Sequence, residues 1–195
     1  MKRMRMLVFT VSAIVVMLCA GAMGQSVGDQ STYFVTYFSN NVSGAPDATL
    51  RFINDGESGY NLWAEIYVFD DSQELSECGQ CGVSPDGLLS EDVKTELTNN
   101  PLTGRVPTRG VIKVISSYYD FGPTYPVPYP GLRGWATHIE RATPTSGAYA
   151  TTEAPVADSN LGSGELTLLE NLCYYLGLLG SGQGTIACTA EDQDF

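Results

Sequence analysis

The sequence predicts a mainly β protein: an antiparallel β-sandwich of immunoglobulin-like size, with one C-terminal α-helix packed on it. Three observations support this fold class. Short stretches rich in β-branched and aromatic residues recur between turn residues, as strands do. Only one segment has the apolar periodicity of a helix. Of the 195 residues, about 170 remain once the first 24 are set aside, and this is enough for one domain with a hydrophobic core.

Five stretches are predicted to be strands because their apolar residues alternate or run on between turn residues. They are Tyr33–Phe38, Thr49–Ile53, Leu62–Phe69, Gly110–Ser116 and Trp135–Ile139. Asn54-Asp55-Gly56, followed by Gly59, predicts a loop between two of them. Ser84-Pro85-Asp86-Gly87 predicts a tight turn, because proline fixes one dihedral angle and glycine allows a positive one.

One helix is predicted from Ser163 to Gly177, with Ser163 as its N-cap and Gly177 or Gly180 at its end. Its apolar residues recur with a 3.6-residue period and are expected to form one face against the sheets: Leu168, Leu169, Leu172, Cys173 and Leu176. Two long loops are expected, at about 118–131, where prolines disfavour central strands, and at about 143–162, which is rich in Thr, Ala, Ser and Pro.

The N-terminus has the pattern of a secretory signal peptide. Lys2, Arg3 and Arg5 precede an apolar run from Met6 to Ala20, and small residues follow this run. The run is shorter than the roughly 20 residues of a membrane span, although an uncleaved anchor is the alternative. We therefore expect residues 1–24 to be cleaved and residues 25–195 to form a single β-rich domain that is secreted, whether periplasmic or extracellular.

The charge of the chain excludes two classes of partner. The formal net charge is −12, and loss of the three N-terminal cations would leave 7 Lys and Arg against 22 Asp and Glu, a net charge of −15. Nucleic acids and anionic membrane surfaces both require a positive binding surface. The sequence therefore predicts no nucleic-acid partner and no membrane contact beyond the signal peptide.

Four cysteines remain after the signal peptide: Cys78, Cys81, Cys173 and Cys188. An even number in an exported chain predicts disulfides, and four cysteines allow three pairings. The local pairing, Cys78–Cys81 with Cys173–Cys188, is the first expectation, and the crossed pairings remain open. Two alternatives also remain open: a redox-active Cys-x-x-Cys pair formed by Cys78 and Cys81, and a zinc site with four thiolate ligands.

Several segments together resemble a family of uncharacterised exported bacterial proteins. The segments run from Asn61 to Glu74, Glu77 to Cys81, Glu96 to Gly104, Gly110 to Ser117, Leu132 to Ile139 and Glu165 to Cys188. The family carries a further cysteine beside the position of Cys78 and often another near the C-terminus, where this chain has Gly79 and Thr189 or Ala190. The resemblance implies one exported domain with a cysteine-containing C-terminal helix, and it implies no activity.

No catalytic motif is found, and no catalytic residue or cofactor is predicted. His138 is the single histidine and shares one strand face with Glu140, so any proton transfer by histidine would depend on it. Four carboxylates follow a predicted strand and are a possible calcium site, although they lack the loop pattern of such sites: Asp70, Asp71, Glu74 and Glu77. A solvated acidic loop is the alternative interpretation.

The tyrosine-proline loop is the strongest candidate for a binding surface. Four of its tyrosines offer flat amphipathic rings that suit sugars or proteins: Tyr118, Tyr119, Tyr125 and Tyr129. The leading hypothesis is a non-enzymatic structural or binding module of the cell envelope or extracellular space, with a polysaccharide or another envelope protein as partner. The alternative is a thiol–disulfide protein that uses Cys78 and Cys81. The sequence leaves the oligomeric state open.

Overall fold

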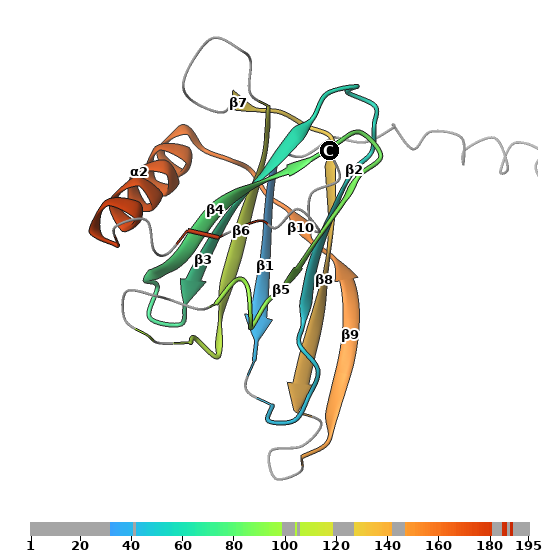
Figure 1. Cartoon of the computed structure of the whole chain (residues 1–195), viewed down its shortest axis with the longest axis vertical. Coiled ribbons are helices and arrows are strands. Elements are labelled where there is room, and N and C mark those ends of the chain that lie inside the picture. Colours follow the sequence, from blue (N-terminus) through green and yellow to red (C-terminus); the bar gives the residue numbers. More distant parts are fainter. Residues whose placement is uncertain are drawn as a thin grey trace, which may run out of the picture. The chain divides into compact units, whose positions relative to one another are not determined.

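The computed structural model describes residues 32–40, 42–98, 104, 106–118, 127–141, 147–180, 185, 186 and 188. The described chain forms two antiparallel β-sheets and one helix near its C-terminal end (Figure 1). The predicted fold class, a β-sandwich with a C-terminal helix packed on it, is therefore confirmed. The predicted signal peptide lies outside the described residues.

The larger sheet has the strand order β10-β1-β6-β3-β4, with the short β7 paired to β6. β3 and β6 are central in this sheet, and β4 is an edge strand. Its strands are β1 (Tyr33–Ser39), β3 (Leu62–Asp70), β4 (Leu75–Val83), β6 (Arg109–Tyr118), β7 (Val127–Pro128) and β10 (Ala157–Asp158).

The smaller sheet has the order β5-β2-β8-β9 and covers one face of the larger sheet (Figure 1). Its strands are β2 (Thr49–Asn54), β5 (Leu88–Asp92), β8 (Leu132–Arg141) and β9 (Tyr149–Pro155). The chain crosses between the sheets along both edges. The turn at residues 84–87 joins β4 to β5, and Val156 joins β9 to β10, so each edge of the sandwich is partly closed by covalent chain.

All five predicted strands are present, each lengthened by one to five residues. The expected loop at about 143–162 is partly wrong, because β9 and β10 lie within it. β9 pairs along its whole length with β8, although nearly every one of its side chains is exposed. The loop at about 118–131 contains only the two-residue β7, and residues 119–126 lie outside the described part of the chain.

The main core lies between the two sheets. Alternate residues of each strand point into it, including Leu62, Ala64, Ile66 and Val68 from β3, which are all 0% exposed. Burial of apolar side chains at roughly 25 cal/mol per Å² is the main stabilising contribution to such a core. Gly134 is required in β8, because a Cβ there would lie 2.5 Å from the ring of Phe52.

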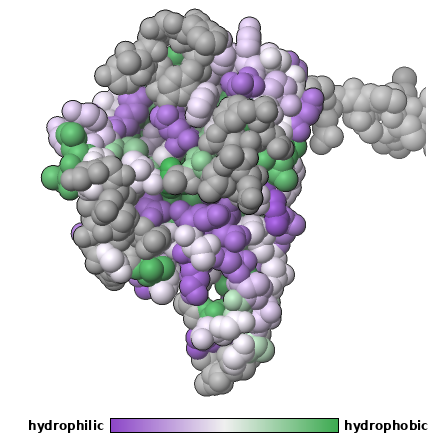
Figure 2. All heavy atoms as spheres, viewed as in Figure 1, coloured by the Kyte–Doolittle hydropathy of each residue, from purple (hydrophilic) through white to green (hydrophobic). Residues whose placement is uncertain are grey.

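Helix α2 (Ser163–Leu179) covers the outer face of the larger sheet and packs against β4 (Figure 1). Leu169 and Leu176 are buried in a second core with residues of β1, β3, β4 and β6. The predicted helix is confirmed, but its N-cap is Gly162 rather than Ser163, and Gly180 ends it. Leu168 was predicted to face the sheet, yet it is 50% exposed. Figure 2 shows hydrophobic side chains at the surface on the side that carries α2.

A polar contact fixes the first turn of α2 on the sheet. Lys113 of β6 donates to Glu165 over 2.5 Å, and the Tyr33 hydroxyl donates to the same carboxylate over 3.1 Å. The hydrogen bond from Lys113 is the main reason that the pKa of Glu165 lies below its usual value. Burial and the neighbouring Glu165 raise the pKa of the Tyr33 hydroxyl well above its usual value. The ion pair therefore anchors the helix at the end opposite Leu176.

Candidate functional site

The two disulfides join β4 to the C-terminal part of the chain. Cys78 is bonded to Cys173 of α2, with a Cα–Cα distance of 5.8 Å. Cys81 is bonded to Cys188, with a Cα–Cα distance of 5.6 Å. The expected local pairing is therefore wrong, and one of the two crossed pairings is present. Cysteines in proteins that mature in oxidising compartments are typically paired in this way.

The conformation of β4 explains the pairing. Successive side chains of a strand point to opposite faces, so residues three positions apart cannot meet. Cys78 points outward into the core beneath α2, whereas Cys81 points into the sandwich. A dithiol made of these two cysteines, and a zinc site made of all four, would require them on one side of the sheet. The structure places the two disulfides on opposite sides.

A short C-terminal segment lies along the outer edge of β4. The amide of Ile186 donates to the carbonyl oxygen of Cys78 over 2.8 Å, and Thr185 forms a parallel bridge with the same residue. Gly79 permits this approach, because a Cβ at Gly79 would lie 2.6 Å from the Cβ of Ile186. The segment therefore covers hydrogen-bonding groups that an edge strand would otherwise expose.

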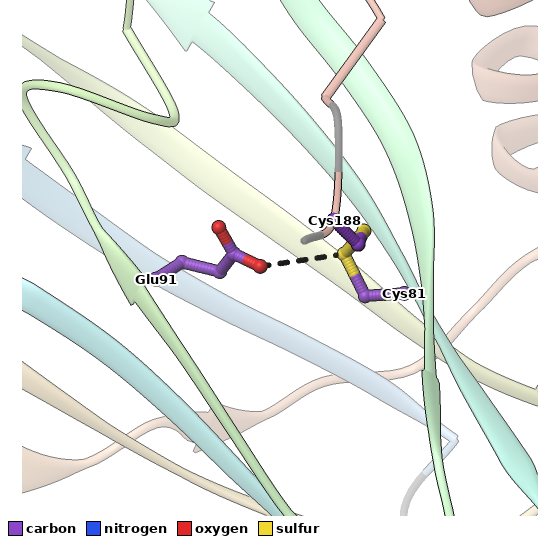
Figure 3. A group of neighbouring side chains, drawn as sticks. All are labelled: Cys81, Glu91 and Cys188. Atoms are coloured by element: carbon purple, nitrogen blue, oxygen red, sulfur yellow. Dashed lines mark hydrogen bonds between the residues drawn. A yellow bond between two sulfur atoms is a disulfide. The ribbon is translucent and has the colours of Figure 1, made fainter. Parts of the chain in front are cut away.

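A buried carboxyl group lies beside the inner disulfide. Glu91 extends from β5 toward β4, and its Oε1 is 3.5 Å from the Sγ of Cys81 (Figure 3). Glu91 is 1% exposed and Cys81 is 0% exposed, while Cys188 is half-buried. The two sulfur atoms and a carboxylate oxygen of Glu91, which are potential metal-ligand atoms, lie within 4.8 Å of one another. Because the two sulfurs are bonded together, the arrangement is a disulfide with an adjacent carboxyl group.

The sequence analysis missed Glu91. The signal was present in the alternation of Leu89, Ser90 and Glu91, which places the carboxyl on the same face as a core leucine. Burial of a carboxyl group is unfavourable unless it is bonded or protonated. The inward position of a glutamate in an alternating stretch is therefore the signal that could have singled out Glu91.

The predicted acidic cluster does not form a single site. Asp70 accepts hydrogen bonds from the backbone amides of Ser72 and Glu74, which stabilises the β3–β4 turn. Asp71 forms an ion pair with Arg109 over 2.8 Å. Glu77 lies on the inward face of β4. Within the described ranges, the one group of three potential ligands close together is the group around Cys81, and none of these four carboxylates belongs to it.

Glu77 is 5% exposed, and its Oε2 has no hydrogen-bond partner among the described residues. Burial raises the pKa of its carboxyl from 4.5 to about 8. The group is therefore protonated in the folded protein at neutral pH. Glu65, on the other face of the sheet, is also buried and its pKa is raised mainly by burial, but the Tyr67 hydroxyl donates to it over 3.0 Å.

Three tyrosines form a cluster at the end of the sandwich near β7, which we call the tyrosine end. The centroid of the Tyr60 ring is 4.7 Å from that of Tyr118 and 6.1 Å from that of Tyr129, and the latter two are 5.9 Å apart. Tyr118 and Tyr129 pack against the main core, whereas Tyr60 is 46% exposed. Two of the four predicted binding tyrosines are thus brought together, and Tyr119 and Tyr125 lie outside the described residues.

Tyr60 was missed because it comes from a distant loop, between β2 and β3, and only the fold brings it to the tyrosine end. Gly56 and Gly59, with φ values of 75° and 67°, give this loop its tight course. The backbone amide of Tyr129 donates to Ser116 over 2.8 Å and holds the other side of the cluster. No signal in the sequence connects Tyr60 with the tyrosine-proline loop.

His138 is 6% exposed and stacks on Tyr37, with ring centroids 4.1 Å apart. The Tyr37 hydroxyl donates to Glu140 over 2.9 Å. Burial lowers the pKa of His138, and the nearby Glu140 partly opposes this shift. The Nδ1 atom of His138 has no hydrogen-bond partner in the described part of the chain. His138 therefore stacks on Tyr37 of the opposite sheet, and among the described residues no carboxylate is hydrogen-bonded to its Nδ1, as a proton-transfer pair would require.

No family model, curated protein or solved structure matches this chain. Among the described residues, no helix is both long enough and apolar enough to cross a bilayer. The tyrosine end and the disulfide beside Glu91 are therefore the two candidate functional sites of this chain.

Proposed function

We propose that this protein is an exported, non-enzymatic binding module and that its tyrosine end binds a neutral polysaccharide. The observation that carries the proposal is the cluster of three tyrosine rings, one of them largely exposed, at one end of the sandwich. Aromatic rings provide flat surfaces against which the apolar faces of sugar rings pack, while the hydroxyl groups remain available for hydrogen bonds.

The rigidity of the tyrosine end supports this role. Tyr118 and Tyr129 are held by the core beneath them, and Tyr60 contacts both rings. Side chains that are already ordered lose little conformational entropy when a ligand binds. The two disulfides support export, since such bonds persist in oxidising compartments.

The charge near the tyrosine end supports a neutral ligand. Glu57 lies in the same loop as Tyr60, and the whole chain is strongly acidic, whereas Asp55 of that loop is ion-paired with Arg133 over 3.2 Å. Because like charges repel, an anionic glycan would be disfavoured at this surface. Nothing comparable disfavours an uncharged polysaccharide.

The test is binding of the exported protein to a panel of neutral and anionic polysaccharides, followed by titration calorimetry with soluble fragments. Tyr60→Ala should weaken binding about two- to tenfold, because aromatic contacts contribute about 0.5–1.5 kcal/mol beyond the area that they bury. Tyr60→Phe, which keeps the ring, should retain most of the affinity. Tyr149→Ala is the matched control, since Tyr149 is 43% exposed on β9 and lies outside the tyrosine end.

Two results would contradict the proposal. One is the absence of saturable binding across the neutral panel. The other is binding that Tyr60→Ala leaves unchanged while circular dichroism shows an intact fold, because the ligand would then contact another surface.

A further inference from the structure

We propose that Cys81–Cys188 is an exchangeable, redox-active disulfide and that Glu91 is the proton donor for Cys81 when this bond is reduced. The co-reactant would be a small thiol or dithiol. Three features support the inference: the different exposure of the two cysteine residues, the position of the Glu91 carboxyl, and the presence of a second disulfide that lacks this carboxyl. It is independent of the tyrosine end.

The two cysteine residues differ in exposure. Cys188 is half-buried and belongs to the short segment that lies along the edge of β4, whereas Cys81 is fully buried in the sandwich. Thiol–disulfide exchange requires in-line attack on an accessible sulfur. The external thiolate would therefore attack Cys188, and Cys81 would be the leaving group.

The leaving sulfur would carry negative charge in a poorly solvated site. The interior side chains around it are mainly apolar, and Leu50 pairs directly with Glu91 across β2 and β5. An uncompensated thiolate is unfavourable there, and its pKa would be raised. Glu91 Oε1 is 3.5 Å from this sulfur, within the range of a hydrogen bond to sulfur, so the carboxyl can supply a proton where charge develops.

The thiolate of the reductant forms a bond to Cys188 Sγ, the Cys81–Cys188 bond breaks, and its electron pair goes to Cys81 Sγ. The Glu91 carboxyl transfers its proton to that sulfur and becomes a carboxylate, which then accepts the S–H hydrogen bond. A second thiolate of the reductant then attacks the reductant sulfur that is bonded to Cys188. Cys188 leaves as a thiolate, and the reductant leaves as its own disulfide. Two electrons are transferred in total, and oxidation follows the reverse path.

The second disulfide is an internal control. Cys78–Cys173 also joins a fully buried cysteine of β4 to a half-buried cysteine of the C-terminal region. Its buried sulfur lies in a core with Tyr33, Ile115 and Leu169. Within the described residues, no carboxylate forms a close group with this pair of cysteines. Cys78–Cys173 is exposed to a similar degree but lacks a neighbouring carboxyl group, so we expect its thiol–disulfide exchange to be slower than that of Cys81–Cys188.

The experiment treats the folded, oxidised protein with dithiothreitol at several pH values between 5 and 9. Samples are quenched by alkylation, and peptide mass spectrometry gives the rate at which each disulfide opens. We expect Cys81–Cys188 to open at least ten times faster than Cys78–Cys173. We also expect its rate, divided by the dithiothreitol thiolate concentration, to fall as pH rises, because Glu91 loses the proton that it donates.

Glu91→Gln should slow opening of Cys81–Cys188 by about tenfold or more at low pH and remove this pH dependence. Glu77→Gln is the matched control, since Glu77 is another buried carboxyl on the inward face of β4 and lies outside the group around Cys81. His138 of β8 and Asp70 at the end of β3 are further buried titratable residues, and they remain unchanged in both variants.

Equal opening rates for the two disulfides would overturn the proposal. So would a thiolate-normalised rate for Cys81–Cys188 that is independent of pH, and this result can be obtained from the wild-type protein even if Glu91→Gln does not fold. A Glu91→Gln protein that folds and opens with the wild-type pH profile would remove Glu91 from the mechanism.

Discussion

Replacement of Glu77 by glutamine should stabilise the protein at neutral pH. The carboxyl of Glu77 is buried between the sheets, and burial raises its pKa from 4.5 to about 8. Below pH 4.5 the carboxyl is protonated in both the folded and the unfolded chain, so it contributes no pH dependence. As pH rises from 4.5 to 8, the unfolded chain releases the proton that the folded chain retains, and unfolding becomes more favourable.

The magnitude follows from the pKa difference. Each pKa unit corresponds to about 1.4 kcal/mol, so the wild-type protein loses up to about 3 kcal/mol between pH 4.5 and pH 7. Relaxation of the surroundings around the ionised carboxylate reduces this figure, and we expect a loss of about 1–3 kcal/mol. Glu77→Gln has no such loss, because its amide does not ionise.

The assay is urea unfolding of both proteins at pH 5, 6, 7 and 8, with the free energy of unfolding extrapolated to zero urea. Glu74→Gln is the control, because it removes the same charge at an exposed position of the same hairpin. The difference between Glu77→Gln and wild type should grow with pH, while Glu74→Gln should follow the wild type. Parallel curves for Glu77→Gln and wild type from pH 5 to 8 would refute the reasoning.

Two further predictions concern the attachments of the C-terminal region. Gly79→Ala should speed hydrogen exchange at the amide of Ile186, because the new Cβ would lie 2.6 Å from the Ile186 side chain and weaken the hydrogen bond of this amide to Cys78. An unchanged exchange rate would show that the hydrogen bond survives the substitution. Lys113→Met should lower the free energy of unfolding by about 0.5–1 kcal/mol at pH 7. Because the pKa of Glu165 is depressed in the folded state, this difference should vanish as pH falls through that pKa, as urea unfolding at pH 7 and pH 3 can measure.

The strands that could be predicted from the sequence are those with one or both faces buried, because burial requires a recognisable pattern of apolar residues. β3, with Leu62 to Phe69, carries enough apolar residues for its pattern to identify it. β9 was interpreted as a loop because its sequence, Tyr-Ala-Thr-Thr-Glu-Ala-Pro, lacks an apolar face. It is a strand because β8 offers it an unpaired edge, and hydrogen bonding to that edge does not require a buried side-chain face.

β4 was missed for a different reason. Its nine residues include two glycines, a glutamate and a glutamine, which are unfavourable in strands by local preference. Tertiary contacts override this preference: β4 pairs with β3, is covered by α2 on one face and faces the smaller sheet on the other. The candidate sites depend on the same contacts, so Tyr60 and Glu91 could be placed only once the sheets were known.

The spacing Cys-x-x-Cys has a different consequence in a strand from the one it has at a helix start. In β4 it sends the two sulfurs to opposite faces, so the C-terminal region is bonded to the strand from both sides. The two disulfides close overlapping loops, with sequence separations of 95 and 107 residues. Once one bond is formed, the other closes only a short additional loop. This loop runs through residues 78–81, the first disulfide and residues 173–188.

The two stabilising effects should therefore be non-additive. Closing a loop of roughly 100 residues contributes about 4.7 kcal/mol in the chain-entropy model, and a loop of roughly 15 residues about 3 kcal/mol. Replacing Cys78 and Cys173 by serine, or Cys81 and Cys188, should each cost about 3 kcal/mol, because the remaining bond still closes the long loop. Replacing all four should cost about 8 kcal/mol, more than the sum of the two pairs. Urea unfolding of the three variants measures this difference, and simple additivity would show that the unfolded chain does not behave as one doubly closed loop.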